Sequence, residues 1–233
     1  MTSNKENQYI KYLENEVGKF KANQDTRCEY LVNEVSDLTI NNILDVGCGA
    51  GQELLPFADM EGVLCIGVDV EESAGRIFRK YLAEKHYSIM PAFICSRGEE
   101  IPFDNHTFDV VICRVALPYM NNRRAIAEMS RVIRPGGVLL LRTHTPNFYL
   151  GMMIRRSREM SLKGIAYPII CFIGGTWHWI TGRQLERGLW KGKEIFQTTG
   201  LLKKELRHLN MQIVKNELSQ DGEARSYVIE KIK

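Results

Sequence analysis

The chain has 233 residues, of which 44% are hydrophobic and 25% are charged. This length and composition are ordinary for one globular domain with a sizeable core. The 31 basic and 28 acidic residues nearly balance, which excludes the strongly basic footprint of a dedicated nucleic-acid binder.

The N-terminal region predicts two helices. Residues 1–8 are polar and lack the apolar core of a signal peptide. Between residues 8 and 38, apolar residues recur at three- and four-residue spacing, which is typical of amphipathic helices. They are Ile10, Leu13, Val17, Phe20, Leu31, Val35 and Leu38.

From residue 43 the pattern changes to short apolar runs separated by helical stretches. Such runs, rich in Val, Ile and Leu, are typical of strands buried on both faces. They cover residues 43–46, 63–68, 92–95, 110–113 and 138–141, and helices are expected near residues 53–60, 73–85 and 123–132. The alternation predicts an α/β fold with a doubly wound, mostly parallel sheet.

The rest of the chain is less regular. Residues 134–137, Arg-Pro-Gly-Gly, predict a turn before the fifth strand. No clear pattern follows for about fifty residues after Leu141. A helix over residues 200–208 and two strands over 211–217 and 225–232 then close the chain, with a hairpin turn at Asp221-Gly222.

The six cysteines and the acidic residues indicate no metal site. No C-x-x-C pair occurs in the sequence, so neither a zinc site nor a thioredoxin-like redox motif is expected. Several cysteines lie in strand-like runs, where reduced cysteine acts as a small buried hydrophobe. We therefore expect a reducing, cytoplasmic compartment.

A glycine-rich segment, Asp45-Val46-Gly47-Cys48-Gly49-Ala50-Gly51, connects the first strand to a helix. Glycine allows the backbone to approach a ligand closely, and the helix that follows offers free N–H groups. The dinucleotide fingerprint G-x-G-x-x-G/A fails here because its sixth position is Gln52. The segment resembles motif I of class I methyltransferases, although a turn without a ligand remains an alternative.

Asp69 ends the second strand, eighteen residues after Gly51. The spacing places its carboxylate beside the glycine segment at the carboxyl edge of the sheet. A carboxylate there can accept both hydroxyls of a ribose, whereas a lone Asp after a strand more often caps a helix. The glycine segment favours the ribose role.

Three further motifs extend the resemblance over residues 41–145. They are residues 99–103 (Glu-Glu-Ile-Pro-Phe), residues 108–111 (Phe-Asp-Val-Val), and residues 128–137, which end in Arg-Val-Ile-Arg-Pro-Gly-Gly. Together they are similar to the S-adenosylmethionine-dependent methyltransferase group that includes ubiquinone- and menaquinone-biosynthesis enzymes. The resemblance implies a Rossmann-like, seven-stranded sheet with a C-terminal antiparallel strand, N-terminal helices and a substrate lid after the fifth strand.

The resemblance also implies which residues hold S-adenosylmethionine. These cofactor-binding residues are Asp45, Gly47, Gly49, Asp69, Val70, Gly98, Glu99 and Arg114. One position departs from the family, because Arg97 stands where many members have an acidic residue that bonds the adenine amino group. Arginine has no acceptor, so adenine recognition is expected to fall to the backbone of Gly98 and to Glu99.

His144 follows the fifth strand and is the best-placed candidate for a general base. A hydrogen-bonded structural histidine is the alternative. Arg114 follows the fourth strand, where it could contact the cofactor or an acidic substrate, or lie on the surface. The next residues, Leu117-Pro118-Tyr119, differ from the D/N-P-P-Y of many nitrogen methyltransferases and weakly disfavour that chemistry.

The domain boundaries follow from these observations. We expect an N-terminal helical cover over residues 1–40, a cofactor-binding core over 41–146, a substrate insertion over 147–193 and a C-terminal completion over 194–233. Tyr9, Tyr12 and Arg27 of the cover are candidates to reach the methionine carboxylate or the substrate. Residues 165–180 are too short and interrupted to span a membrane, and we interpret them as a hydrophobic lid, with core packing, a homodimer contact or membrane lipid as alternatives.

The leading hypothesis is methyl transfer from S-adenosylmethionine to a small, partly apolar metabolite, with oxygen favoured over carbon or nitrogen as the acceptor. S-adenosylhomocysteine is the other product. A methyltransferase that acts on RNA, protein or glycan, and a non-catalytic scaffold, are the alternatives. A continuous basic surface at the site would favour the former, and absence of cofactor binding the latter.

Overall fold

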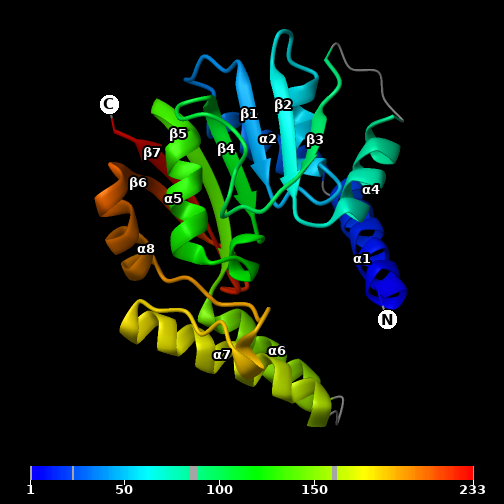
Figure 1. The fold of residues 1–233 in the computed structure, drawn as a ribbon, viewed down its shortest axis with the longest axis vertical. Helices are drawn as coiled ribbons and strands as arrows, with labels where there is room; N and C mark the ends of the chain where they lie inside the picture. The colour runs from blue at the N-terminus through cyan, green and yellow to red at the C-terminus, as the bar shows by residue number, and fades with distance from the viewer. Residues whose placement is uncertain (1, 23, 84–88, 159–161, 233) are drawn as a thin grey trace.

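The computed structural model describes residues 2–22, 24–83, 89–158 and 162–232. A seven-stranded sheet in the order β3-β2-β1-β4-β5-β7-β6 forms the centre of the molecule (Figure 1). Strands β1 to β5 run parallel, whereas β7 is antiparallel to both β5 and β6. The seven strands are β1 (Asn42–Val46), β2 (Leu64–Asp69), β3 (Ala92–Cys95), β4 (Phe108–Arg114), β5 (Ile133–His144), β6 (Met211–Leu218) and β7 (Ala224–Lys231). This confirms the predicted fold class.

Helices cover both faces of the sheet. Successive strand residues point to opposite sides, and the apolar residues on each side pack against helices in a separate cluster. One hydrophobic cluster joins Leu44, Val111 and Leu139 to α5 (Asn122–Val132) and α8 (Thr199–Leu206). The other joins Ile43 and Val110 to four N-terminal helices. These are α1 (Thr2–Ala22), α2 (Gln24–Asn33), α3 (Leu55–Ala58) and α4 (Glu72–Leu82).

Several predicted elements differ in extent. The helix expected near residues 53–60 is the 3-10 turn η1 (Gln52–Leu54) followed by the single turn α3. The helix expected over 73–85 ends at Leu82 in α4, and Lys85 lies outside the described residues. The short η2 (Leu117–Tyr119), η3 (Gly188–Trp190) and η4 (Arg207–Leu209) complete the turns.

The turn predicted at residues 134–137 was wrong, because these residues belong to β5. The pairing of β4 with β5 shifts register here. Phe108 pairs with Ile133, and Val110, two residues later, pairs with Val138, which lies five residues after Ile133. The extra residues form an irregular bulge, with Gly136 at a φ of 79°. Proline and glycine thus distort a strand at this position instead of preceding one.

The stretch without a clear pattern after Leu141 contains two helices, α6 (Pro146–Arg158) and α7 (Leu162–Thr181), which pack beside one another below the carboxyl edge of the sheet (Figure 1). Pro168 lies inside α7 and removes the N–H that would bond the Gly164 carbonyl. Arg156 of α6 donates to that carbonyl at 2.9 Å and satisfies it. Among the described residues, no helix is both long and apolar enough to cross a membrane.

Candidate active site

The glycine segment leaves β1 at the point where the strand order reverses between β1 and β4, which is where open α/β sheets bind ligands. Gly47 has a φ of 74°, and a Cβ at this position would collide with the side chain of Ala116. The Gly47 N–H donates to the Val68 carbonyl at 2.8 Å. The loop is therefore anchored to β2 in a conformation that favours glycine.

Asp69 holds the other side of this loop. Its Oδ2 accepts the Gly49 N–H at 3.0 Å, and its Oδ1 accepts the Glu71 N–H at 3.0 Å. The hydroxyl of Tyr9, from α1, lies 3.4 Å from Oδ2. Burial raises the pKa of Asp69, and the backbone hydrogen bonds oppose this shift. The N-terminal helix therefore lies over the expected ribose position, and the ribose role of Asp69 stays a prediction.

Asp45 is a buried carboxylate at the start of the glycine segment. Its residue is 1% exposed, and its Oδ2 has no hydrogen-bond partner in the structure. Burial, together with the charge of Asp69, raises the pKa of Asp45 to about 7. A buried acceptor without a donor is costly, so Asp45 fits a site that a cationic ligand completes.

Two arginines from different elements converge on Glu53. Arg27 of α2 donates to both oxygens of this buried carboxylate. The Nε of Arg114, at the end of β4, lies 3.2 Å from Oε1 but is not aligned as a hydrogen bond. The Arg114 side chain is 11% exposed, so the alternative of a surface arginine was wrong. Burial lowers the pKa of Arg27 to about 10 and also lowers that of Arg114.

The predicted adenine side of the site lies after β2 and β3. Val70 is exposed, and Gly98 packs so closely against Met120 that a Cβ would lie 2.6 Å from its Sδ. The Oε1 of Glu99 accepts the Asn121 N–H at 2.9 Å and pairs with Arg97 at 3.2 Å. Glu99 thus holds the start of α5 in this structure, and its adenine contact stays a prediction.

His144 lies at the end of β5, on the same edge as the glycine segment. Its Nδ1 lies 3.2 Å from the Oε2 of Glu194, and its ring stacks on Phe148 with 3.6 Å between centroids. Two strand spacings separate β5 from β1, or roughly 10 Å. His144 therefore lies on the same sheet edge as the glycine segment. The role of its imidazole as a general base stays a prediction.

Glu194 accepts hydrogen bonds from two tyrosines in addition to its contact with His144. Its Oε1 accepts the Tyr167 hydroxyl at 2.5 Å, and its Oε2 accepts the Tyr149 hydroxyl at 3.2 Å. Burial acts to raise the pKa of Glu194, but the hydrogen bonds from His144 and Tyr167 outweigh it and hold the pKa below its ordinary value. The residue is therefore a buried carboxylate that stays ionised.

Sequence reasoning missed Glu194 and Tyr149. Glu194 precedes the apolar pair Ile195-Phe196, and both of these residues are buried. The position of Glu194 next to this apolar pair is the one sequence feature that could have indicated a buried carboxylate. A buried carboxylate requires hydrogen-bond partners, which would have pointed to a site. Tyr149 is fully buried in α6, a helix that the sequence pattern did not predict.

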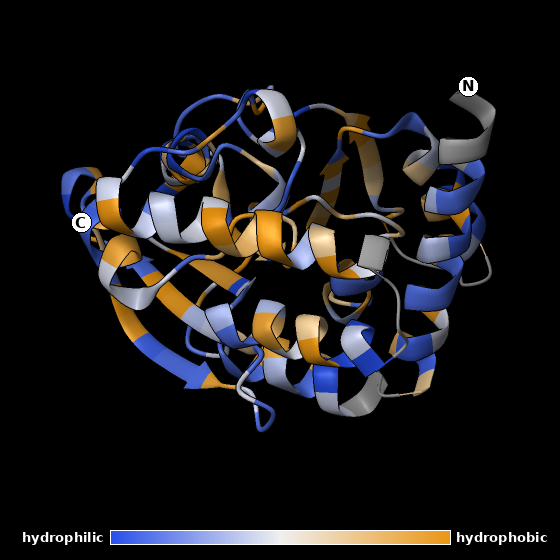
Figure 2. Cartoon of the chain, turned by 90° about the horizontal axis from the view of Figure 1, so that it is seen from below, coloured by the Kyte–Doolittle hydropathy of each residue, from blue (hydrophilic) through white to orange (hydrophobic). Residues whose placement is uncertain are grey.

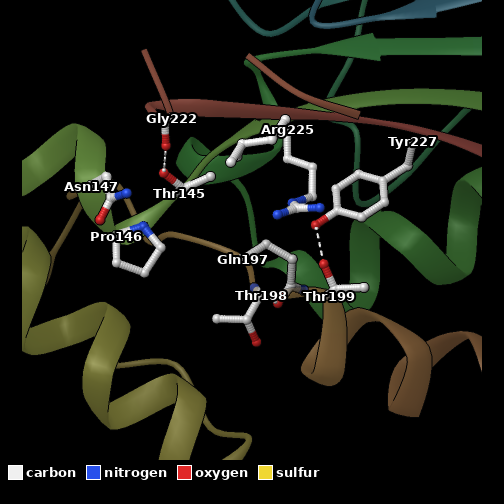
Figure 3. Close-up of a pocket in the computed structure, with 10 residues that line it drawn as sticks. Thr145, Pro146, Asn147, Gln197, Thr198, Thr199, Gly222, Arg225 and Tyr227 are labelled. Atoms are coloured by element: carbon white, nitrogen blue, oxygen red, sulfur yellow. Dashed lines mark hydrogen bonds between the residues drawn. The ribbon is translucent and has the colours of Figure 1, made fainter. Parts of the chain in front are cut away.

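A separate cavity of about 300 Å³ lies beside the start of α8. Figure 3 shows Arg225 and Tyr227 pointing toward Gln197 and Thr199, and the Tyr227 hydroxyl lies 3.0 Å from that of Thr199. None of the glycine-segment residues lines this cavity. In the described part of the chain, no cluster of three or more potential metal ligands occurs and no disulfide joins two cysteines.

Comparisons with known proteins show similarity to methyltransferases. Residues 44–141 match a protein-family model described as "Methyltransferase domain". The chain is 31% identical over 105 residues to the uncharacterized methyltransferase YcgJ of Bacillus subtilis, which covers 45% of this chain and 41% of YcgJ. The chain thus spans less than half the length of this curated relative.

A second relative is the ubiquinone/menaquinone biosynthesis C-methyltransferase UbiE of Paraburkholderia xenovorans. The identity is 37% over 102 residues, covering 42% of this chain and 41% of UbiE. Among solved structures, the magnesium protoporphyrin IX methyltransferase of Synechocystis PCC 6803 with bound SAH has a TM-score of 0.60 at 18% identity, covering 89% of this chain and 82% of that one. At this identity the likeness concerns the fold.

Proposed function

We propose that the chain, whose residues 44–141 match a methyltransferase domain model, is a class I S-adenosylmethionine-dependent methyltransferase that methylates a small, partly apolar acceptor with an ionisable hydroxyl. The observation that carries this proposal is the pair of His144 and Glu194 at the carboxyl end of β5. The pair lies at the edge that carries the glycine segment, and Tyr149 of α6 and Tyr167 of α7 donate to Glu194.

The residues of the glycine segment fit the cofactor. The unpartnered Oδ2 of Asp45 would accept the methionine ammonium group, and Asp69 would accept the ribose hydroxyls. Tyr9 would have to share Asp69 with the ribose or move away, because Asp69 already accepts two backbone N–H groups. When bound, S-adenosylmethionine supplies an electrophilic methyl group and leaves as S-adenosylhomocysteine.

His144 would remove the proton of the acceptor. With its Nδ1–H donated to Glu194, the Nε2 carries the lone pair that takes the hydroxyl proton as the oxygen bonds the methyl carbon. Glu194 stabilises the imidazolium that results, as a carboxylate does for histidine bases in general. The ring stack on Phe148 holds the imidazole in place.

The acceptor would lie between the sheet edge and the helices of the insertion. Tyr149 of α6 and Tyr167 of α7 both donate to Glu194, so the insertion is fastened to the proposed catalytic pair. The aromatic rings of Phe148, Tyr149, Phe172 and Phe196 pack together there. This surrounding suits an apolar frame and excludes water from the reacting groups.

Carbon methylation is the second candidate. The name of the relative UbiE specifies a C-methyltransferase, and the same base could ionise a phenol that then reacts at a ring carbon. The family match ends at residue 141, before His144 and the whole insertion. We favour oxygen because methylation there requires only the one proton transfer that His144 would perform, whereas a methylated ring carbon must afterwards lose a proton of its own.

The test measures methyl transfer from S-adenosylmethionine labelled in the methyl group to phenols that carry apolar substituents. We expect labelled methyl ethers and a rate that falls with His144→Ala. His208→Ala, an exposed histidine outside the site, is the matched control. Ring-methylated products would favour the second candidate, and an unchanged rate and pH profile for His144→Ala would remove histidine catalysis.

A further inference from the structure

Helix α7 presents a continuous apolar stripe to solvent. Ile169, Ile173, Trp177 and Ile180 follow one another at four- and three-residue spacing and are between 40% and 72% exposed. Residues at this spacing share one face of a helix. Exposed apolar residues are normal when scattered, but a continuous stripe marks an interaction surface.

The opposite face of α7 is buried in the protein. Cys171 and His178 are almost fully buried, and a Cβ at Gly174 would meet Trp190, whereas one at Gly175 would meet Phe196. Helix α7 is therefore fixed to its own domain along one side. Because one side of α7 is packed against protein, only its other side could contact lipid. In a membrane, α7 would therefore lie along the surface and would not span the bilayer.

Helix α6 extends the stripe into a wider face. Leu150 and Ile154 of α6 are 41% and 55% exposed. Figure 2 shows α6 and α7 side by side across the near face of the molecule, with hydrophobic positions on both. We define the docking face as Leu150, Ile154, Ile169, Ile173, Trp177 and Ile180. Trp179 and Leu189 are also exposed in this region.

The insertion is strongly basic. Residues 147–193 contain eight Lys and Arg residues and two Glu residues, a net charge of +6, which leaves −3 for the rest of the chain because the total is +3. The eight are Arg155, Arg156, Arg158, Lys163, Arg183, Arg187, Lys191 and Lys193. An apolar face within a basic segment is complementary to an anionic lipid surface.

A second copy of the chain fits the docking face less well. A twofold dimer through this face would bring two segments of net charge +6 together. Like charges across an interface oppose association. Trp177 and Trp179 are also the amphipathic side chains that settle at the boundary between water and acyl chains.

From the apolar stripe and the charge of the insertion, we infer that the α6–α7 docking face binds the surface of an anionic lipid bilayer. The apolar residues enter the headgroup boundary while the exposed basic residues of the insertion, Arg158, Arg183, Arg187 and Lys191, contact the anionic headgroups. Tyr149 and Tyr167 link the same two helices to Glu194. One consequence rests on the proposed function, whereas the binding itself does not. If the chain methylates a lipid-soluble acceptor, the bilayer would hold the active site where that acceptor is available.

The test is sedimentation of the full chain with vesicles of phosphatidylglycerol and phosphatidylcholine in equal parts, and with vesicles of phosphatidylcholine alone. We expect binding to the mixed vesicles, weakened by salt, and little binding to the neutral ones. The double variant Trp177→Ser with Ile180→Ser should lower partitioning by about tenfold or more. Val214→Ser, which changes an exposed residue of β6, should leave it unchanged.

A charge variant tests the same inference without touching the apolar residues. Arg183→Gln with Arg187→Gln should lower binding to the mixed vesicles by roughly fivefold for each arginine that contacts the headgroups. Absence of binding to the mixed vesicles, or equal binding by the double apolar variant, would overturn the inference. So would sedimentation velocity that shows a dimer dissociated by Trp177→Ser with Ile180→Ser. Binding needs no turnover, so failure here leaves the proposed methyl transfer standing.

Discussion

The sharpest prediction concerns the protonation of Asp45 and the binding of S-adenosylmethionine. Burial raises the pKa of this carboxyl group to about 7, and its Oδ2 has no donor. If Asp45 accepts the methionine ammonium group, only its ionised form binds the cofactor well. Affinity should therefore rise with pH below neutrality.

The magnitude follows from the pKa. With a pKa of about 7, the ionised fraction of Asp45 grows from about one hundredth at about pH 5 to about one half at about pH 7. The association constant for S-adenosylmethionine should then increase roughly fiftyfold over this range. Each binding event should also release about one proton to the buffer at about pH 5 and about half a proton at about pH 7.

The assay is isothermal titration calorimetry across this pH range, in buffers of different ionisation enthalpy. Asp45→Asn keeps the shape of the side chain but removes its charge, so its affinity should be weaker and nearly independent of pH. A flat profile for the unmodified chain would refute the assigned role of Asp45. A rise that Asp45→Asn retains would assign the titration to another group, with Asp69 the first to consider because burial raises its pKa as well.

Three further predictions concern Asp69, Glu194 and the pH dependence of stability. Asp69→Ala should weaken cofactor affinity by about 1.5–3 kcal/mol for each ribose hydrogen bond, whereas Ala at the exposed Asp59 should not; equal calorimetric affinities would refute the ribose role. Glu194→Gln should lower kcat/KM by about tenfold to a hundredfold and shift the pH–rate profile of His144, and an unshifted profile would show that Glu194 does not act through the histidine. Burial raises the pKa of both Asp45 and Glu205 to about 7, so the folded chain holds more protons than the unfolded chain between about pH 4 and 7. The free energy of unfolding should fall as pH rises through this window, by up to about 1.4 kcal/mol per pH unit for each group. Denaturant titrations should show a smaller slope for Glu205→Gln, and a rise in stability over the window would contradict the assignment. The lowered pKa of Glu194 acts in the opposite sense, because its contribution is lost only as the pH falls below its ordinary value.

The sheet could be predicted because its signals are local. The apolar runs near residues 43–46, 63–68 and 110–113 are strands buried on both faces, and they coincide with β1, β2 and β4 within a few residues. The glycine segment and Asp69 were brought together as predicted, since the carboxyl ends of adjacent parallel strands meet at one edge.

Helices α6 and α7 escaped prediction for a physical reason. Helix α7 is apolar on its buried face at Cys171 and on its exposed face at Ile173 and Trp177, so it lacks the polar face that marks an amphipathic helix. Proline inside a helix removes a hydrogen bond, yet Arg156 from the neighbouring helix satisfies the carbonyl that Pro168 leaves free. A contact between two elements cannot be read from the spacing within one.

Only part of the candidate site could be predicted, because several of its contacts also join residues of separate elements. Gly47 and Asp69 belong to a contiguous pattern, whereas Glu194 reaches His144 from fifty residues away. The Arg27–Glu53–Arg114 cluster also joins three separate elements. Such pairings depend on how helices α2 and η1 pack against the end of β4, which single-sequence patterns do not specify.

The most direct test of the central claim is a crystal structure of the chain with S-adenosylhomocysteine. We expect the ribose hydroxyls to contact Asp69, the amino group to lie at Asp45, and the sulfur to face the space between the glycine segment and His144. A ligand that binds elsewhere, or a folded chain whose glycine segment stays free of the ligand at saturating concentration, would contradict the assignment of this segment as the cofactor site.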